Sequence, residues 1–106
     1  MDYLNTVTLQ GLVMSEPRFG KTQAGKAAVN FKIKTERNVN GRVYTECHNI
    51  VAYDRIADLM EASDIECGDC VHIVGRLQTN SRTSCDNNII TNVEVVAYQF
   101  AVKEVN

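Results

Sequence analysis

The sequence predicts an all-β fold, a five-stranded barrel with one short helix between strands three and four. Five segments alternate apolar and polar residues with the period of two that half-buried strands show. A single segment with helical spacing separates the third of these from the fourth. The chain has 106 residues. Because single domains cluster around roughly 100–150 residues, we expect residues 1–106 to form one domain.

The first strand is predicted at residues 6–10, where threonine and glutamine alternate with valine and leucine. Gly11, followed by the apolar residues 12–14, indicates a bulge or bend that continues the strand. Residues 15–17, Ser-Glu-Pro, end it. The polar stretch from there to Gly25 is predicted to be a loop or a frayed edge.

The second and third strands are predicted to form a hairpin. Residues 29–34 place three apolar side chains on one face, and Lys32 and Lys34 on the other. Residues 38–41 contain the Asn-Gly pair that type I′ hairpin turns favour. The third strand then runs over residues 43–53, and its period of two puts His48 and Tyr53 on opposite faces.

Residues 56–63 carry apolar side chains at helical spacing, and Gly68 is predicted to end this helix in the C′ position. Strand four is predicted over residues 71–77 and strand five over residues 89–102, with a polar loop at residues 80–88 between them. The predicted order is three strands, a helix and two strands, with a glycine where a strand bends to close a small barrel. This is the order of elements in the OB fold.

The net charge of −2 argues against a uniformly basic protein, but the charges are sorted along the chain. Residues 17–55, which we call the basic segment, hold eight Lys and Arg against three Asp and Glu. Residues 56–75 hold five acidic residues and no basic one. The basic segment indicates a positive face, and a solvated surface that has sorted its charges in this way is the alternative.

The chain shows no apolar run of about 18 residues and no leader at its first residues, so a cytoplasmic protein with free thiols is expected. Cys67 and Cys70 form a CxxC pair, and a zinc site could be assembled from it with further Cys and His residues. Those residues are Cys47, His48, His72 and Cys85. Closed zinc sites usually have two close ligand pairs, so ordinary thiols, no metal and no cofactor are predicted. No catalytic motif is present, which predicts a protein that is not an enzyme.

Four segments, in order and with matched spacing, resemble the single-stranded DNA-binding protein family of bacteria and their phages. They are residues 6–17, residues 25–31 (GKAAVNF), residues 45–53 (TECHNIVAY) and residues 65–79. The resemblance implies sequence-tolerant binding of single-stranded DNA by an OB fold, in a homotetramer or homodimer. It also implies that the protein protects or organises single-stranded DNA in replication, recombination or repair, near the nucleoid, with replication proteins as further partners and no membrane.

The resemblance also indicates binding residues, since bases stack on aromatic rings while basic side chains follow the phosphates. The positions where the family most often has tryptophan align with Val39, Cys47 and Arg82, so Tyr53 is predicted as the main stacking platform. The predicted phosphate contacts are basic side chains: Lys32, Lys34, Arg37, Arg42, Arg55, Arg76 and Arg82. The alternatives are a ring that covers the barrel end and a solvated basic face.

Two further expectations concern assembly. His48 aligns with a family position at a subunit contact, and a hydrogen-bonded histidine beside the core is the alternative. Family members commonly continue into a flexible linker with an acidic tip that recruits other enzymes, whereas this chain ends at residues 103–106, so no acidic tail is expected. The alternative function is an OB-fold interaction module of a replication or primosome assembly, with weak DNA binding.

Overall fold

The computed structural model describes residues 3–103. Two terminal stretches lie outside this range, residues 1–2 and 104–106. The expectations about a leader and an acidic tail depend on these residues. Six strands and one helix follow each other along the chain. They are β1 (Val7–Val13), β2 (Arg18–Lys21), β3 (Ala27–Val39), β4 (Arg42–Tyr53), α1 (Asp54–Ala62), β5 (Cys70–Thr83) and β6 (Ile89–Lys103).

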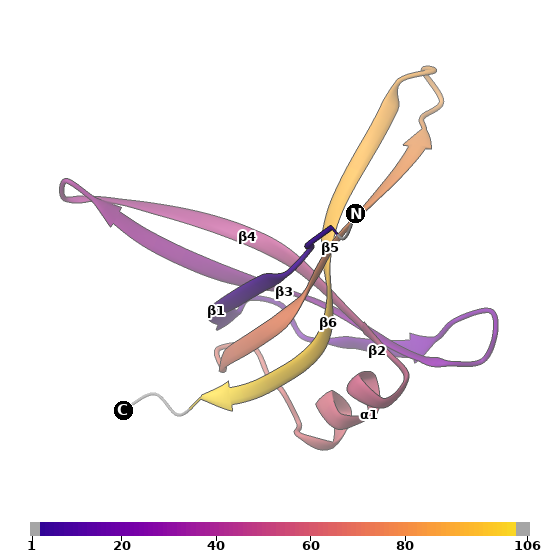
Figure 1. Cartoon of the computed structure of the whole chain (residues 1–106), viewed down its shortest axis with the longest axis horizontal. Helices are drawn as coiled ribbons and strands as arrows, with labels where there is room; N and C mark the ends of the chain where they lie inside the picture. Colours follow the sequence, from indigo (N-terminus) through magenta and orange to yellow (C-terminus); the bar gives the residue numbers. More distant parts are fainter. Residues whose placement is uncertain (1–2, 104–106) are drawn as a thin grey trace.

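The strands form one sheet in the order β1-β5-β6-β4-β3-β2, and a further pairing of β1 with β3 closes it into a barrel. The barrel has five strands, because the four-residue β2 pairs only with β3 and lies outside the ring. The helix follows the third barrel strand, so the predicted five-stranded OB-fold barrel is confirmed. The β3–β4 and β5–β6 hairpins continue beyond the barrel as two long arms (Figure 1).

Two glycines allow the barrel strands to approach closely. A Cβ atom at Gly11 would overlap the carbonyl group of Lys34, at the point where β1 turns from its partner β5 to its partner β3. A Cβ atom at Gly75 would overlap the carbonyl group of Val96, beside the register shift between β5 and β6. Gly11 thus lies where β1 changes its partner, and the close approach of the strands there leaves no room for a side chain.

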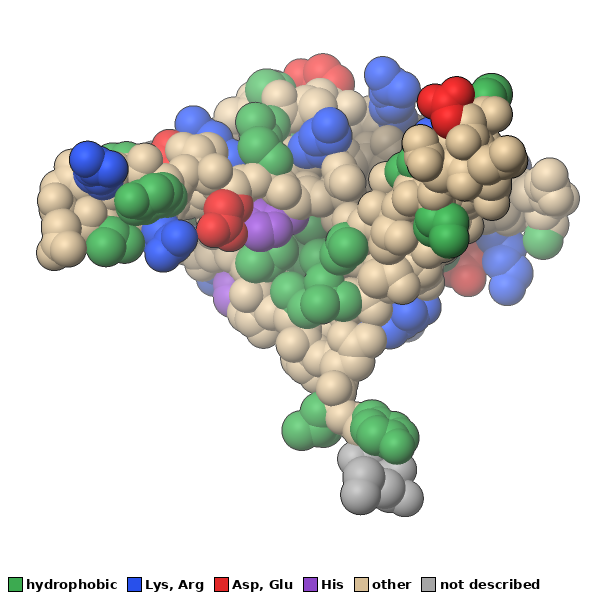
Figure 2. All heavy atoms as spheres, turned by 90° about the horizontal axis from the view of Figure 1, so that it is seen from above, with side chains coloured by type: hydrophobic (Ala, Val, Ile, Leu, Met, Phe, Trp, Pro, Cys, Tyr) green, Lys and Arg blue, Asp and Glu red, His purple; other side chains and the backbone are tan. Residues whose placement is uncertain are grey.

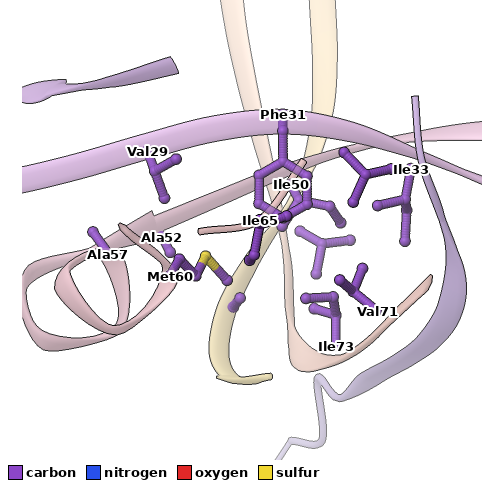
Figure 3. Packing of buried hydrophobic residues seen from close by; sticks show 13 residues of the cluster. Val29, Phe31, Ile33, Ile50, Ala52, Ala57, Met60, Ile65, Val71 and Ile73 are labelled. Atoms are coloured by element: carbon purple, nitrogen blue, oxygen red, sulfur yellow. The ribbon is translucent and has the colours of Figure 1, made fainter. Parts of the chain in front are cut away.

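The barrel interior is filled by the apolar side chains that the alternation predicts. Val29, Phe31 and Ile33 on β3 are buried, together with side chains from the facing strands. Ala57 and Met60 of α1 cover one end of this core (Figure 3). Full burial of one such large aliphatic or aromatic side chain contributes roughly 1.5–3 kcal/mol, so the fold depends on the period of two along β3.

The end of the helix differs from the prediction. The helix ends at Ala62 with Ser63 as its C-cap, and Asp64 takes the left-handed conformation, with φ 56°, that was predicted for Gly68. The Leu59 carbonyl accepts the Ser63 backbone N–H at 2.9 Å and the Ser63 hydroxyl at 2.8 Å. Gly68 lies later, in the turn that leads into β5, also with positive φ at 98°.

The first four residues of the predicted polar loop at residues 80–88 are strand. β5 continues to Thr83, so only residues 84–88 connect it to β6. Polar side chains pair across this arm, with 3.2 Å between the hydroxyls of Ser81 and Thr91. An arm with solvent on both faces needs no apolar alternation, which is why this strand pattern was missed.

Candidate nucleic-acid interface

The outer face of the sheet carries a row of side chains that crosses five strands. Register pairs join Arg18 on β2 to Asn30 on β3, Val51 on β4, Val96 on β6 and Arg76 on β5. Partner residues in neighbouring strands project to the same face. The row, which we call the arginine row, therefore places a cation at each end of a floor made by Asn30, Val51 and Val96.

A groove runs over this outer face. It consists of two adjoining hollows of about 550 and 280 Å³, and Arg18, Asn30 and Val51 line both of them. Lys32 lies on the wall of the larger hollow and Tyr53 on the wall of the smaller one. Glu16 and Glu94 also line the larger hollow. A groove with cations and an aromatic ring on its walls is suited to a strand of nucleic acid.

The ring of Tyr53 is held at the junction of strand and helix. Tyr53 ends β4 with extended backbone at φ −131° and is also the N-cap residue of α1. Asp54 follows with φ 55°, so the chain turns sharply immediately after the ring. The side chain remains 38% exposed, on the face opposite to the core. A half-exposed ring on a fixed backbone is available to stack on a base.

Of the predicted phosphate contacts, Lys32 and Arg76 lie on the outer face with Tyr53. Lys34 lies two residues further along the same face of β3, where its ammonium is 3.5 Å from the carboxylate of Glu36. Arg82 lies on the β5–β6 arm, paired with Ile90, and so lies away from the arginine row.

Arg37 and Arg42 lie on the other face of the β3–β4 arm. Arg37 is an odd number of residues from Lys32, so the alternation of the strand points the two side chains in opposite directions. The Arg37 guanidinium lies 4.9 Å from the centre of the Tyr44 ring and its Nε is 3.6 Å from the Glu46 carboxylate. Arg55 is exposed in the first turn of α1.

The three acidic residues of the basic segment are all held in ion pairs. They are Glu36, Glu46 and Asp54, paired at 3.5–3.9 Å with Lys34, Arg37 and Lys26. These pairs are exposed and contribute little to stability. The remaining basic residues of the segment have no carboxylate partner among residues 3–103; they are Arg18, Lys21, Lys32, Arg42 and Arg55. In Figure 2 the basic side chains are spread over the arms and rim instead of forming one patch.

Arg18 was not predicted as a binding residue, although it lies at one end of the arginine row. A strand of four residues is too short for its alternation to be recognised, and only the pairing of β2 with β3 brings Arg18 beside Asn30. The amides of Asn30 and Asn49 also line the groove and were not singled out. Their position on the outer face follows from the same alternation that places Lys32 there.

His48 lies on the side of β4 opposite to Tyr53, as predicted. It is half-buried, and its Nε2 is 2.9 Å from the Thr35 hydroxyl. With Leu77 and Val93 it lines a crevice of about 130 Å³. A hydrogen-bonded histidine at the edge of an apolar surface is compatible with a subunit contact and also with a structural position beside the core.

The cysteines Cys47, Cys67, Cys70 and Cys85 are free thiols. Among residues 3–103 no three His, Cys, Asp or Glu side chains are grouped in a way that would hold a metal ion. In the same part of the chain, no helix has the length and apolar character needed to cross a bilayer.

Comparison with known proteins agrees with this geometry. The model of the single-strand binding protein family matches residues 4–102. The chain belongs to this family. The resemblance predicted from four sequence segments is thereby confirmed, and binding of a single strand is what the family's name describes. No curated protein sequence matches the chain.

A solved structure supports the fold of this family member. It is described as the Plasmodium falciparum SSB complex with ssDNA, and it matches with a TM-score of 0.89 over 98% of each chain. The two sequences are 23% identical. The similarity therefore confirms the OB-fold barrel and its strand order, while the residues of the groove are this chain's own.

Proposed function

We propose that this chain binds single-stranded DNA in the groove of its outer face, with little preference for sequence. The observation that carries the proposal is the groove lined by Arg18, Lys32 and Tyr53, from which the arginine row continues across the sheet to Arg76. The family assignment supports single-stranded DNA as the ligand. Binding of this kind requires no catalytic group, and we propose a role that is not enzymatic.

Different side chains of the proposed site contact the phosphates and the bases. Arg18 and Lys32 in the groove, with Arg76 at the far end of the arginine row, neutralise phosphates, and such contacts are independent of sequence. Tyr53 offers its ring to one base, and stacking tolerates every base because each has a π face. The apolar surface of Val51 between the two arginines accepts the sugars and bases that pass over it.

The two arms extend the proposed contact beyond the groove. Arg82 on the β5–β6 arm, with Arg37 and Arg42 on the β3–β4 arm, would meet phosphates of a strand that leaves the groove and follows an arm. The remaining predicted phosphate contacts are Lys34 and Arg55. Lys34 would exchange its ion-pair partner Glu36 for a phosphate. These exposed contacts are worth less than those inside the groove, because solvent screens them more strongly.

We further propose that the apolar crevice beside His48 is a contact between copies of the chain, in a homodimer or homotetramer. Leu77 and Val93 line it with exposed fractions of 46% and 51%. Burial of such side chains favours association. The same exposed surface favours the second candidate, an interaction module that binds a replication protein with weak DNA contact. Protection of single-stranded DNA in replication, recombination or repair, near the nucleoid, remains part of the proposal.

Fluorescence anisotropy of labelled oligo-dT, compared with a duplex of the same length across a range of salt concentration, tests the proposal. We expect preference for the single strand, and a fall of log K with log salt of about 0.7 for each phosphate neutralised. Equal or undetectable binding of both at low salt would reject DNA binding and favour the interaction module. Light scattering in parallel measures the mass of the assembly.

A further inference from the structure

Glu94 brings a negative charge into a groove that is otherwise suited to a polyanion. It lies on β6 and lines the larger hollow together with Lys32 and Asn49. The parallel pairing of β4 with β6 ends, toward the arms, at the pair of Ile50 and Val95. Glu94 is the next residue of β6 beyond this pair, where the β3–β4 and β5–β6 arms diverge (Figure 1). A strand of DNA that leaves the groove between the arms passes close to this carboxylate.

The Glu94 carboxylate is held by two neutral amides. Gln78 Nε2 donates a hydrogen bond of 2.8 Å to Glu94 Oε1, and Asn80 Nδ2 donates one of 3.0 Å to the same oxygen. Both donors lie on β5, where Gln78 is the register partner of Glu94. Among residues 3–103 the other oxygen, Oε2, has no donor, and no basic side chain forms an ion pair with the carboxylate. One oxygen is thus fixed in place, and the other is free to accept a hydrogen bond from a ligand.

A free carboxylate oxygen distinguishes the bases by the group that they present to it. Cytosine carries the N4 amino group where thymine carries the O4 carbonyl, and adenine carries the N6 amino group. An amino group donates to a carboxylate, whereas a carbonyl would bring two acceptors together with no hydrogen between them. The carboxylate also repels phosphates, so a strand in the groove turns its bases toward Glu94 and its backbone toward Lys32.

We propose that Glu94 is a base-reading residue of the groove, which favours cytosine and adenine over thymine in the bound strand. Its Oε2 accepts a hydrogen bond from the amino group of the base, while the phosphates stay with Arg18 and Lys32. The proposal rests on single-stranded DNA binding in the groove. It adds a modest preference at one position of the strand, because the phosphate and stacking contacts proposed for the rest of the groove are tolerant of sequence.

Glu94→Gln keeps the shape of the side chain and changes the hydrogen bonding of its free atom. When Gln78 and Asn80 hold its carbonyl oxygen, the glutamine presents its NH₂ group at the place of Oε2. A donor at that place matches O4 of thymine instead of N4 of cytosine. Glu16→Gln is the matched control, because Glu16 lines the same hollow and its Oε1 accepts the Cys67 backbone N–H at 3.3 Å. It removes the same charge from the hollow at a different place.

The affinities of oligo-dC and oligo-dT of equal length are measured by anisotropy for the wild type and both variants, in slightly alkaline buffer so that cytosine stays unprotonated. Thermal unfolding of each variant checks its folding. Since one hydrogen bond changes an equilibrium constant by about 2- to 13-fold, the ratio of dC affinity to dT affinity should fall by an amount in this range in Glu94→Gln. Glu16→Gln should keep the ratio of the wild type.

The outcomes separate base reading from DNA binding itself. A wild-type chain that shows no preference for oligo-dT over duplex overturns the proposed function. A wild type that prefers the single strand, with the same ratio of dC to dT affinity in Glu94→Gln, overturns base reading alone, since Glu94 would then only hold the arm. An equal fall of the ratio in Glu16→Gln also overturns it, because the effect would belong to the charge of the hollow and not to the free oxygen of Glu94.

Discussion

Removal of the two arginines at the ends of the arginine row tests whether DNA crosses the outer face. Arg18 and Arg76 are on strands at opposite ends of a row that spans five strands. Neither has a carboxylate partner among residues 3–103. Their positive charges are therefore free to neutralise phosphates, and Arg18→Ala, Arg76→Ala and the double variant should weaken binding without disturbing the core.

The magnitude follows from the number of phosphate contacts that the variants lose. Each phosphate contact with single-stranded DNA contributes about −0.7 to the slope of log K against log salt, so the double variant should show a slope shallower by about 1.4. Between 50 and 200 mM salt, the difference in affinity between wild type and double variant should shrink about sevenfold. Each single variant should show about half of this change in slope.

The assay is anisotropy of labelled oligo-dT at four or more salt concentrations. Lys103→Ala, which removes one exposed charge at the end of β6, controls for a general loss of positive charge. Its slope should match that of the wild type. A double variant whose slope is unchanged, or a control whose slope falls as much as that of Arg18→Ala, would show that DNA does not follow the arginine row.

Three further predictions concern the ring, the barrel and the assembly. Tyr53→Phe should bind oligo-dT like the wild type in the same anisotropy assay, because stacking uses the ring; a loss as large as that of Tyr53→Ala would mean that the hydroxyl carries the contact. Gly11→Ala should lower the free energy of unfolding by about 1–3 kcal/mol, seen as a drop of several degrees in Tm, because the added methyl overlaps the Lys34 carbonyl; an unchanged Tm would contradict this. The double variant Leu77→Asp, Val93→Asp should have a mass closer to that of the monomer when it is measured by light scattering. An unchanged mass would place the subunit contact elsewhere.

The barrel could be predicted from alternation because its interior accepts only apolar side chains. Val29, Phe31 and Ile33 are buried as their spacing requires, and Gly11 lies where β1 meets β3. The parts that were missed have solvent on both sides. β2 and the outer half of β5 are held by backbone pairing and polar contacts, which leave no apolar pattern in the sequence.

The sequence predicts which residues of the groove share a face within one strand. It does not predict how the strands lie beside one another. Alternation places Lys32 on the outer face of β3 and Tyr53 on that of β4, and pairing of the strands brings the two faces together. The same alternation separates Arg37 from Lys32, which a count of charges over the basic segment does not reveal. Arg18 enters the site through the register between β2 and β3, and no local property of four residues determines that register.

The path of the DNA is tested most directly by NMR, with the amide shifts of the chain followed during titration with oligo-dT. We expect the largest changes along the groove, at Arg18, Asn30, Val51 and Tyr53, with smaller changes on the arms. The amides around the crevice of Leu77 and Val93 should change little. Changes confined to that crevice, with the groove unaffected, would contradict DNA binding on the outer face.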